Sequence, residues 1–221
     1  MSGRLVRERG RSWTRSLVPG QRHYGEFLRR FQGAEYRSWN GRRSKLAAYL
    51  EKGGQIRLHG NEHVLYLGAA SGTTVSHLSD LLPDGRILAV EMSPRPFRDL
   101  LQLAVTRPNI VPILGDARHP EAYEAYVDRP ADVLVQDIAQ PDQAEILRRN
   151  VVRFAGPEAT TYFAVKARSV NVAAAPAKIY EAVASELRKG GLHVEDRREL
   201  DPLERDHAMF VVTASAKKAT P

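Results

Sequence analysis

Three carboxylates follow three predicted strands in succession and could bind a polar ligand together. Glu91, Asp116 and Asp137 each come at or just after the end of a short apolar run. The carboxyl ends of parallel strands meet at one edge of an open α/β sheet, where ligands bind. One such acid is more often a helix cap or part of a solvated turn, but three at consecutive strand ends favour a binding site.

A glycine-flanked loop precedes these acids. The apolar run 64–67 ends at Gly68, and a helical pattern restarts after Gly72. Glycines let the backbone turn sharply and approach a ligand closely, and the loop leads into a helix N-terminus. A dinucleotide site would normally carry G-x-G-x-x-G, whereas this loop, GAASG, has the looser form typical of S-adenosylmethionine (SAM) sites. Glu91 follows about 20 residues later, the spacing at which a carboxylate accepts hydrogen bonds from ribose hydroxyls. We therefore expect SAM, with an NAD-type Rossmann domain or a plain turn as the alternatives.

A second group of residues could transfer a proton. Asp137 and Lys166 end adjacent predicted strands and should lie near each other. A lysine at a strand end is more often a surface residue. A lysine with a lowered pKa, however, could accept the proton of a ribose 2'-hydroxyl as that oxygen attacks a methyl carbon.

These residues require a mostly parallel sheet to position them. Apolar runs over 64–67, 86–90, 110–114, 132–136 and 161–165 alternate with helical patterns, which predicts an α/β fold. Two further runs, 192–197 and 208–213, have no helix between them and predict an antiparallel hairpin that completes a seven-stranded sheet. Pro112 lacks a backbone N–H and predicts an edge position for its strand.

The N-terminal part of the chain has a different character. Residues 1–20 carry arginines at 4, 7, 9, 11 and 15 and are expected to form a mobile basic arm, although arginines beside Trp13 would also suit phosphate and base contacts. Residues 21–55 are expected to form a small β-rich module with strands over 24–28 and 35–39, and a helix from Ser44 to Leu50. The main domain would span 56–215, followed by a tail over 216–221.

Composition narrows the class of protein. Lys and Arg outnumber Asp and Glu by 33 to 26 in 221 residues, which indicates an acidic partner such as nucleic acid. No apolar run approaches the roughly 18 residues of a membrane span, and the arginine-rich start lacks the apolar core of a signal peptide, so we expect a soluble intracellular protein. Without cysteine the chain has no disulfide or Cys-ligated metal, and its seven scattered histidines form no metal-ligand motif, so no metal is expected.

Six segments, 36–48, 68–74, 109–117, 137–141, 165–169 and 206–210, resemble the archaeal fibrillarin family, the methyltransferases of box C/D ribonucleoproteins. The resemblance implies a SAM-dependent methyltransferase fold (Rossmann-like) with a small N-terminal β module. It also implies guide-RNA-directed 2'-O-methylation of ribose in rRNA and tRNA, in the cytoplasm of an archaeal cell. The implied partners are a Nop-family scaffold protein, a kink-turn-binding ribosomal-type protein, the box C/D guide RNA and the target RNA, with no membrane involved.

The same resemblance assigns roles to individual residues. The catalytic set would be Lys45, Asp137, Lys166 and His207. The SAM contacts would be Gly68, Ala69, Thr73, Thr74, Glu91, Met92, Asp116, Ala117, Asp137, Ile138, Ala139 and Gln140.

Three positions depart from the family pattern, and two rival functions stay open. Met92 stands where the family tends to have Phe or Tyr against the adenine, so a thioether contact replaces stacking. Asn171 replaces an acid and Ile138 replaces a valine, neither at a catalytic position. The rivals are a methyltransferase that acts on protein side chains and a SAM-binding subunit without catalysis. The intact catalytic set argues against the second.

Overall fold

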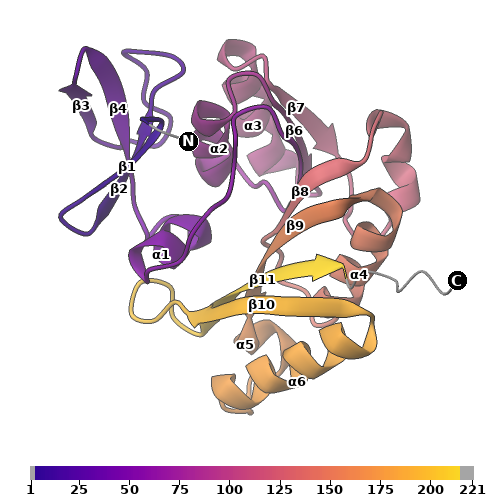
Figure 1. Ribbon diagram of the computed structural model, residues 1–221. Helices are drawn as coiled ribbons and strands as arrows, with labels where there is room; N and C mark the ends of the chain where they lie inside the picture. The colour runs from indigo at the N-terminus through magenta and orange to yellow at the C-terminus, as the bar shows by residue number, and fades with distance from the viewer. Residues whose placement is uncertain (1–2, 215–221) are drawn as a thin grey trace, which may run out of the picture.

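The computed structural model of the chain describes residues 3–214 and contains a seven-stranded sheet as predicted (Figure 1). The strand order is β10-β11-β9-β8-β5-β6-β7, and all pairs are parallel except those that β11 makes with β9 and β10. The strands are β5 (His63–Leu67), β6 (Arg86–Glu91), β7 (Ile110–Leu114), β8 (Ala131–Gln136), β9 (Ala155–Lys166), β10 (Leu192–Glu199) and β11 (His207–Ala214).

Helices cover both faces of this sheet, which explains why its strands are apolar almost throughout. On β5, Val64 and Tyr66 point into one core with α1, α2 and α3, while Leu65 and Leu67 point into a second core with α4 and α6. The helices are α1 (Lys45–Glu51), α2 (Thr73–Leu81), α3 (Pro94–Thr106), α4 (Gln143–Phe154), α5 (Ala167–Val170) and α6 (Pro176–Lys189), with two 3₁₀ turns, η1 (Pro120–Ala122) and η2 (Glu124–Tyr126).

The sheet ends at β7, as Pro112 predicts. Pro112 pairs with Ala89 of β6 and leaves its other side free of a strand, so the missing N–H disrupts no ladder. Ser44 caps α1, also as predicted, because its hydroxyl accepts a hydrogen bond from the Ala47 backbone N–H.

The N-terminal residues form a second sheet, which corrects two expectations. Residues 5–15 are not an arm but two strands of a four-stranded antiparallel sheet with the order β1-β2-β4-β3, made of β1 (Leu5–Glu8), β2 (Arg11–Arg15), β3 (Leu28–Phe31) and β4 (Ala34–Trp39). Of the strand expected over 24–28, residues 24–27 are instead a loop, and β3 begins only at Leu28. In this loop the Glu26 carboxylate accepts from the backbone N–H groups of His23 and Tyr24.

Apolar alternation in the sequence does not predict these strands, because the face that they bury is largely polar. The side chains that β2 and β4 bury against α2 include Ser12, Thr14 and Arg37. Thr14 donates to Asp80 of α2 at 2.8 Å, and Arg37 forms an ion pair with the same carboxylate, also at 2.8 Å. Residues 1, 2 and 215–221, including the predicted tail, lie outside the described part of the chain, and the bounds of the predicted domains stay predictions.

Candidate functional site

The glycine loop crosses the carboxyl edge of the sheet between β5 and α2, and its shape requires both glycines. Gly68 has φ of +84°, and a Cβ there would lie 2.3 Å from the backbone oxygen of Asp137. Gly72 has φ of +90°, and a Cβ there would lie 2.5 Å from Cδ2 of Leu103. Any larger residue would push the loop away from β8 or from α3, so the loop is fixed in place from both sides.

Glu91 anchors this loop to the end of β6. Its carboxylate accepts hydrogen bonds from the Ala70 N–H at 2.8 Å and from the Ser93 N–H at 2.6 Å. Each carboxylate oxygen has a second lone pair, so Glu91 keeps acceptor capacity for a ligand. The sequence predicts a ligand acceptor at this position, and the structure adds a loop-holding role.

A cavity of about 240 Å³ lies beside the loop at the ends of β5 to β8. Nine of the twelve predicted SAM contacts line it: Gly68, Glu91, Met92, Asp116, Ala117, Asp137, Ile138, Ala139 and Gln140. Met92 is 48% exposed at the rim, where its flexible side chain can cover a bound ring. Predicted SAM contacts that are far apart in the sequence thus line one cavity.

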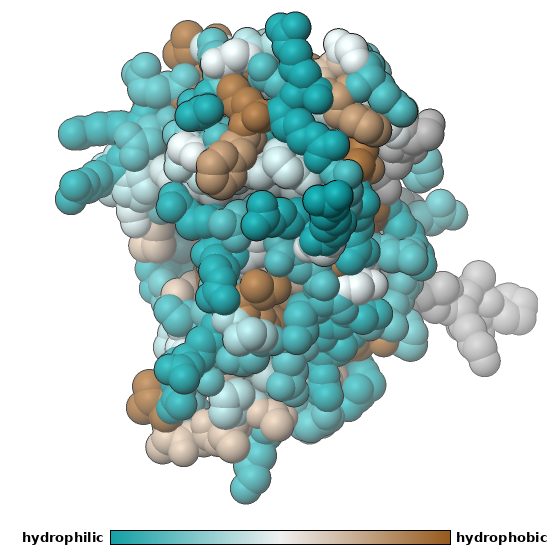
Figure 2. All heavy atoms as spheres, turned by 90° about the vertical axis from the view of Figure 1, so that its left-hand side faces the viewer, coloured by the Kyte–Doolittle hydropathy of each residue, from teal (hydrophilic) through white to brown (hydrophobic). Residues whose placement is uncertain are grey.

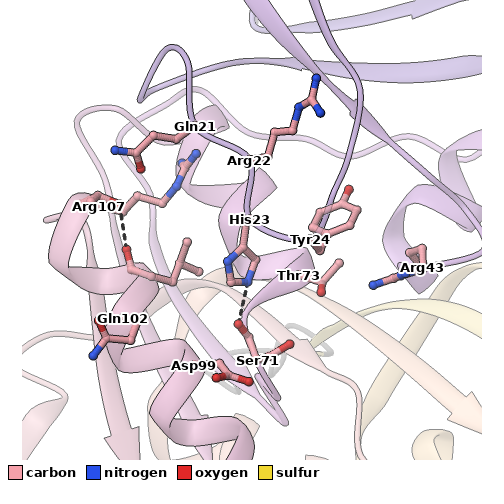
Figure 3. Close-up of a pocket in the computed structure, with 12 residues that line it drawn as sticks. Gln21, Arg22, His23, Tyr24, Arg43, Ser71, Thr73, Asp99, Gln102 and Arg107 are labelled. Atoms are coloured by element: carbon pink, nitrogen blue, oxygen red, sulfur yellow. Dashed lines mark hydrogen bonds between the residues drawn. The ribbon is translucent and has the colours of Figure 1, made fainter.

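The three other predicted contacts lie outside this cavity. Ala69 is buried, and Thr74 is nearly buried and donates from its hydroxyl to Ser44 Oγ at 3.0 Å. Thr73 lines a second cavity of about 380 Å³ on the other side of the loop (Figure 3). There the His23 imidazole Nε2 donates to the Ser71 carbonyl oxygen at 2.7 Å, which ties the loop to the N-terminal module.

Arg118 lines the first cavity and is a residue that the sequence analysis did not single out. Its guanidinium donates to both oxygens of Asp116, with Nη2 2.6 Å from Oδ2, and this hydrogen bonding lowers the pKa of Asp116. Asp116 is therefore an anion well into the acidic range and can only accept hydrogen bonds. The motif GDAR, with an arginine two residues after the acid, could have indicated this pair.

The predicted catalytic residues come together as two pairs. Lys45 Nζ lies 3.2 Å from Oδ2 of Asp137, and Asp137 also lines the cavity. Burial disfavours the charged form of Lys45, but the negative charges of Asp137 and Glu204 outweigh it and raise the Lys45 pKa. Lys45 is therefore a cation at neutral pH.

Lys166 and His207 form the second pair, opposite each other in the register of β9 and β11. His207 Nδ1 lies 2.7 Å from the Arg205 carbonyl oxygen, which can only accept, so Nδ1 carries a proton and Nε2 of the neutral ring does not. Within residues 3–214 no ion pair within 4.0 Å joins Lys166 to Asp137.

Gln143 fixes the backbone at Lys166 and was also missed by the sequence analysis. This fully buried side chain accepts from the Lys166 N–H at 3.1 Å and donates to the Lys166 carbonyl at 3.2 Å. It replaces the strand hydrogen bonds that Lys166 would otherwise lack at the end of β9. Its place in the first turn of α4 carries no motif, so only the structure reveals it.

Two kinds of feature are absent from the described residues. Nowhere in 3–214 do three or more His, Asp or Glu side chains group as a metal ion would require. Over the same residues, every helix is too short or too polar to cross a membrane.

Comparisons with known proteins give a consistent assignment. The sequence model of the Fibrillarin family matches residues 4–216. A fibrillarin-like rRNA/tRNA 2'-O-methyltransferase from Aeropyrum pernix is 50% identical over 199 residues, which are 89% of this chain and 85% of that protein.

Two solved structures agree with this assignment. Aeropyrum pernix fibrillarin with natively bound S-adenosyl-L-methionine is 49% identical, with a TM-score of 0.83 over 92% of this chain and 89% of that one. A fibrillarin in complex with Nop5p is 40% identical, with a TM-score of 0.87 over 96% and 97%. The chain therefore belongs to the fibrillarin family.

Proposed function

We propose that this chain is the catalytic subunit of a box C/D ribonucleoprotein and transfers the methyl group of SAM to ribose 2'-hydroxyls in rRNA and tRNA. One observation carries the proposal. Asp137 lines the cavity at the sheet edge and also holds Lys45, so the proposed cofactor site and catalytic set share a residue. Membership of the fibrillarin family supports the same activity.

The cavity fits the adenosine part of SAM. Gly68 lines the cavity without a side chain, Glu91 would accept from the ribose hydroxyls, and Asp116 would accept from the adenine amine. Met92 would lie against the adenine ring. The relative from Aeropyrum pernix was solved with natively bound SAM, which supports this assignment.

The catalytic residues would accept one proton and neutralise the charge of Asp137. When bound, SAM supplies a methyl group whose C–S bond breaks, with its electrons going to sulfur, as the ribose 2'-oxygen bonds to the methyl carbon. Lys166, in its neutral form, would accept the 2'-hydroxyl proton at Nζ. Lys45 neutralises Asp137, and His207 offers an unprotonated Nε2 beside Lys166.

We also propose the partners and the cellular setting. A fibrillarin related to this chain was solved in complex with Nop5p, which supports a Nop-family scaffold here. A kink-turn-binding ribosomal-type protein, a box C/D guide RNA and target rRNA or tRNA would complete the particle. Relatives of this chain come from archaea, which supports a location of the protein in the cytoplasm of an archaeal cell.

A transfer assay with methyl-labelled SAM tests this function against its rivals. The assembled particle should label a guide-matched RNA, and a substrate with a 2'-deoxy nucleotide at the target position should stay unlabelled. Label in protein instead of RNA would point to a side-chain methyltransferase. SAM binding without transfer to any acceptor would point to a non-catalytic subunit.

A further inference from the structure

The positive charge of the chain is concentrated in its first 40 residues. They hold nine of the 33 basic side chains, all arginines, but only three of the 26 acidic ones, a net charge of +6. The remaining residues hold 24 basic and 23 acidic side chains, a net charge of +1. Arg37 is buried, so the charge available to an anionic partner comes from the other arginines of this segment, most of which lie on the N-terminal sheet.

The arginines of strand β2 lie on the outer face of the N-terminal sheet. Ser12 and Thr14 are fully buried toward α2, whereas Arg11 and Arg15 are exposed and Trp13 is half-buried between them. Successive side chains of a strand point to opposite faces, so the two arginines and the tryptophan share the outer face. In the described residues these two arginines make no ion pair within 4.0 Å.

The outer face also presents stacked planar groups from β3. The Arg29 guanidinium lies 5.6 Å from the centroid of Trp13 and 5.4 Å from that of Phe31, which is 38% exposed. Trp13, Arg29 and its ion-pair partner Glu8 line two adjoining hollows of about 590 and 160 Å³. Arg9 and Arg11 line the larger one. Figure 2, which faces this side, shows apolar side chains interspersed among hydrophilic ones in its upper part.

We propose that this outer face, made of Arg9, Arg11, Trp13, Arg15, Arg29 and Phe31, binds single-stranded RNA. Unpaired bases would stack on the aromatic rings and the Arg29 plane, and backbone phosphates would contact Arg9, Arg11 and Arg15. Arginine and aromatic side chains also occur at protein interfaces, so the choice of RNA rests on charge: the net charge of +6 in this segment matches a phosphate backbone. The face is separate from the cofactor cavity and does not depend on methyl transfer.

Binding of a fluorescein-labelled single-stranded RNA to the full chain, followed by anisotropy between 50 and 200 mM salt, tests this proposal. Trp13→Ala should weaken binding about 5- to 100-fold, the value of one base stack, and leave the salt dependence unchanged. Arg9→Gln combined with Arg11→Gln should lower the slope of log affinity against log salt by about 1.4, because each lost phosphate contact removes about 0.7.

Matched variants separate stacking and charge from general damage. Trp13→Phe keeps a ring and should bind within about twofold of the unchanged protein. Arg188→Gln with Lys189→Gln removes the same charge from exposed positions at the end of α6 and should leave the slope nearly unchanged. If Trp13→Ala fails to fold in thermal unfolding, the double arginine variant still decides the result.

Several outcomes would overturn the proposal. One is equal salt slopes for the Arg9/Arg11 and Arg188/Lys189 double variants. Another is a Trp13→Ala loss that is the same on a blunt RNA duplex, because paired bases cannot stack on the ring. A third is unchanged RNA binding with weakened binding to a Nop-family scaffold, which would make this face a protein interface. A SAM titration of each variant tests the cofactor site independently.

Discussion

Lys166 ends β9 beside His207, and its backbone is held on both sides by the buried Gln143. If it is the proton acceptor, Lys166→Ala in an assembled particle should slow methyl transfer about 100- to 10,000-fold, the usual value of general-base help. SAM affinity, measured by calorimetry, should change little. Lys166→Arg should restore little activity, because guanidinium stays protonated.

The arginine variant also tests the alternative. A near-normal rate for Lys166→Arg from pH 6 to 9 would mean that this position needs only a positive charge. The base would then be sought at His207, whose Nε2 carries no proton in the neutral ring, or in bound water.

Glu91 should matter twice for SAM, as a ribose acceptor and as the anchor of the loop. Glu91→Ala removes an acceptor from the N–H groups of Ala70 and Ser93 as well as from the ligand. We expect SAM affinity to fall about 10- to 100-fold, since hydrogen bonds to a charged group contribute about 1.5 to 3 kcal/mol. Glu91→Gln keeps one acceptor oxygen and should lose less. Unchanged affinity in a folded Glu91→Ala protein would remove this assignment.

The N-terminal sheet and α2 are joined by a buried ion-pair network. Arg37 is fully buried between Glu26 and Asp80, and Arg107 pairs with the other oxygen of Asp80 at 2.7 Å. Removing one partner of such a network leaves buried charges without compensation. Arg37→Met should therefore lower the free energy of unfolding by about 3 to 5 kcal/mol, measured by urea denaturation.

A control variant separates this network from ordinary surface pairing. Arg129→Met breaks only an exposed ion pair with Asp132 and should cost less than about 1 kcal/mol. Equal losses for the Arg37 and Arg129 variants would mean that the network does not hold the two elements together.

His77 gives the same interface a pH dependence. It is fully buried, and burial, followed by the charges of Arg37 and Arg107, holds its pKa well below 6.5. The Thr14 hydroxyl donates to Asp80 and so accepts from His77 Nδ1, which places the proton of the neutral ring on Nδ1. Burial of the ring disfavours a second proton. An unfolded histidine takes up a proton below about pH 6.5, so stability from this group is present above that value and falls as the pH drops.

Denaturation between pH 8 and 5 checks this effect. His77→Asn cannot titrate in this range, so its free energy of unfolding should fall less steeply below pH 6.5 than that of the unchanged protein. Parallel curves for the two proteins would show that His77 does not contribute.

These elements also show where sequence reasoning succeeds. Strands β5 to β9 were predictable because both faces are buried, which makes each strand an apolar run, and because Gly68, Glu91 and Asp137 mark the strand ends. Strands β1 and β2 were not predictable, because β2 buries serine and threonine against a polar helix. The roles of Arg118 and Gln143 were likewise not predictable, because they depend on contacts with other residues and not on a motif.

At the scale of the whole molecule, the cofactor cavity and the proposed RNA-binding face belong to different sheets. Polar contacts join them, among them the buried Arg37 network, the buried hydrogen bond from Thr14 to Asp80, and the partly buried hydrogen bond from His23 to Ser71 in the glycine loop. With both proposals, the N-terminal module would hold an RNA strand while the larger sheet would hold the cofactor. Neither part carries a sequence-reading RNA motif, and the arginines of the outer face would contact phosphates that are common to all sequences.

The choice of target nucleotide should therefore come from the guide and not from this chain. The isolated protein should bind RNA only non-specifically, with a dissociation constant on the order of 10⁻⁴ to 10⁻⁶ M that rises with salt, and should methylate no single position. With scaffold, kink-turn-binding protein and guide added, one nucleotide should be methylated, and a guide of different sequence should move the modification without any change in the protein. Mapping of 2'-O-methyl positions in the product RNA measures this directly. Robust methylation of one site by the protein alone would show that the chain itself reads its target.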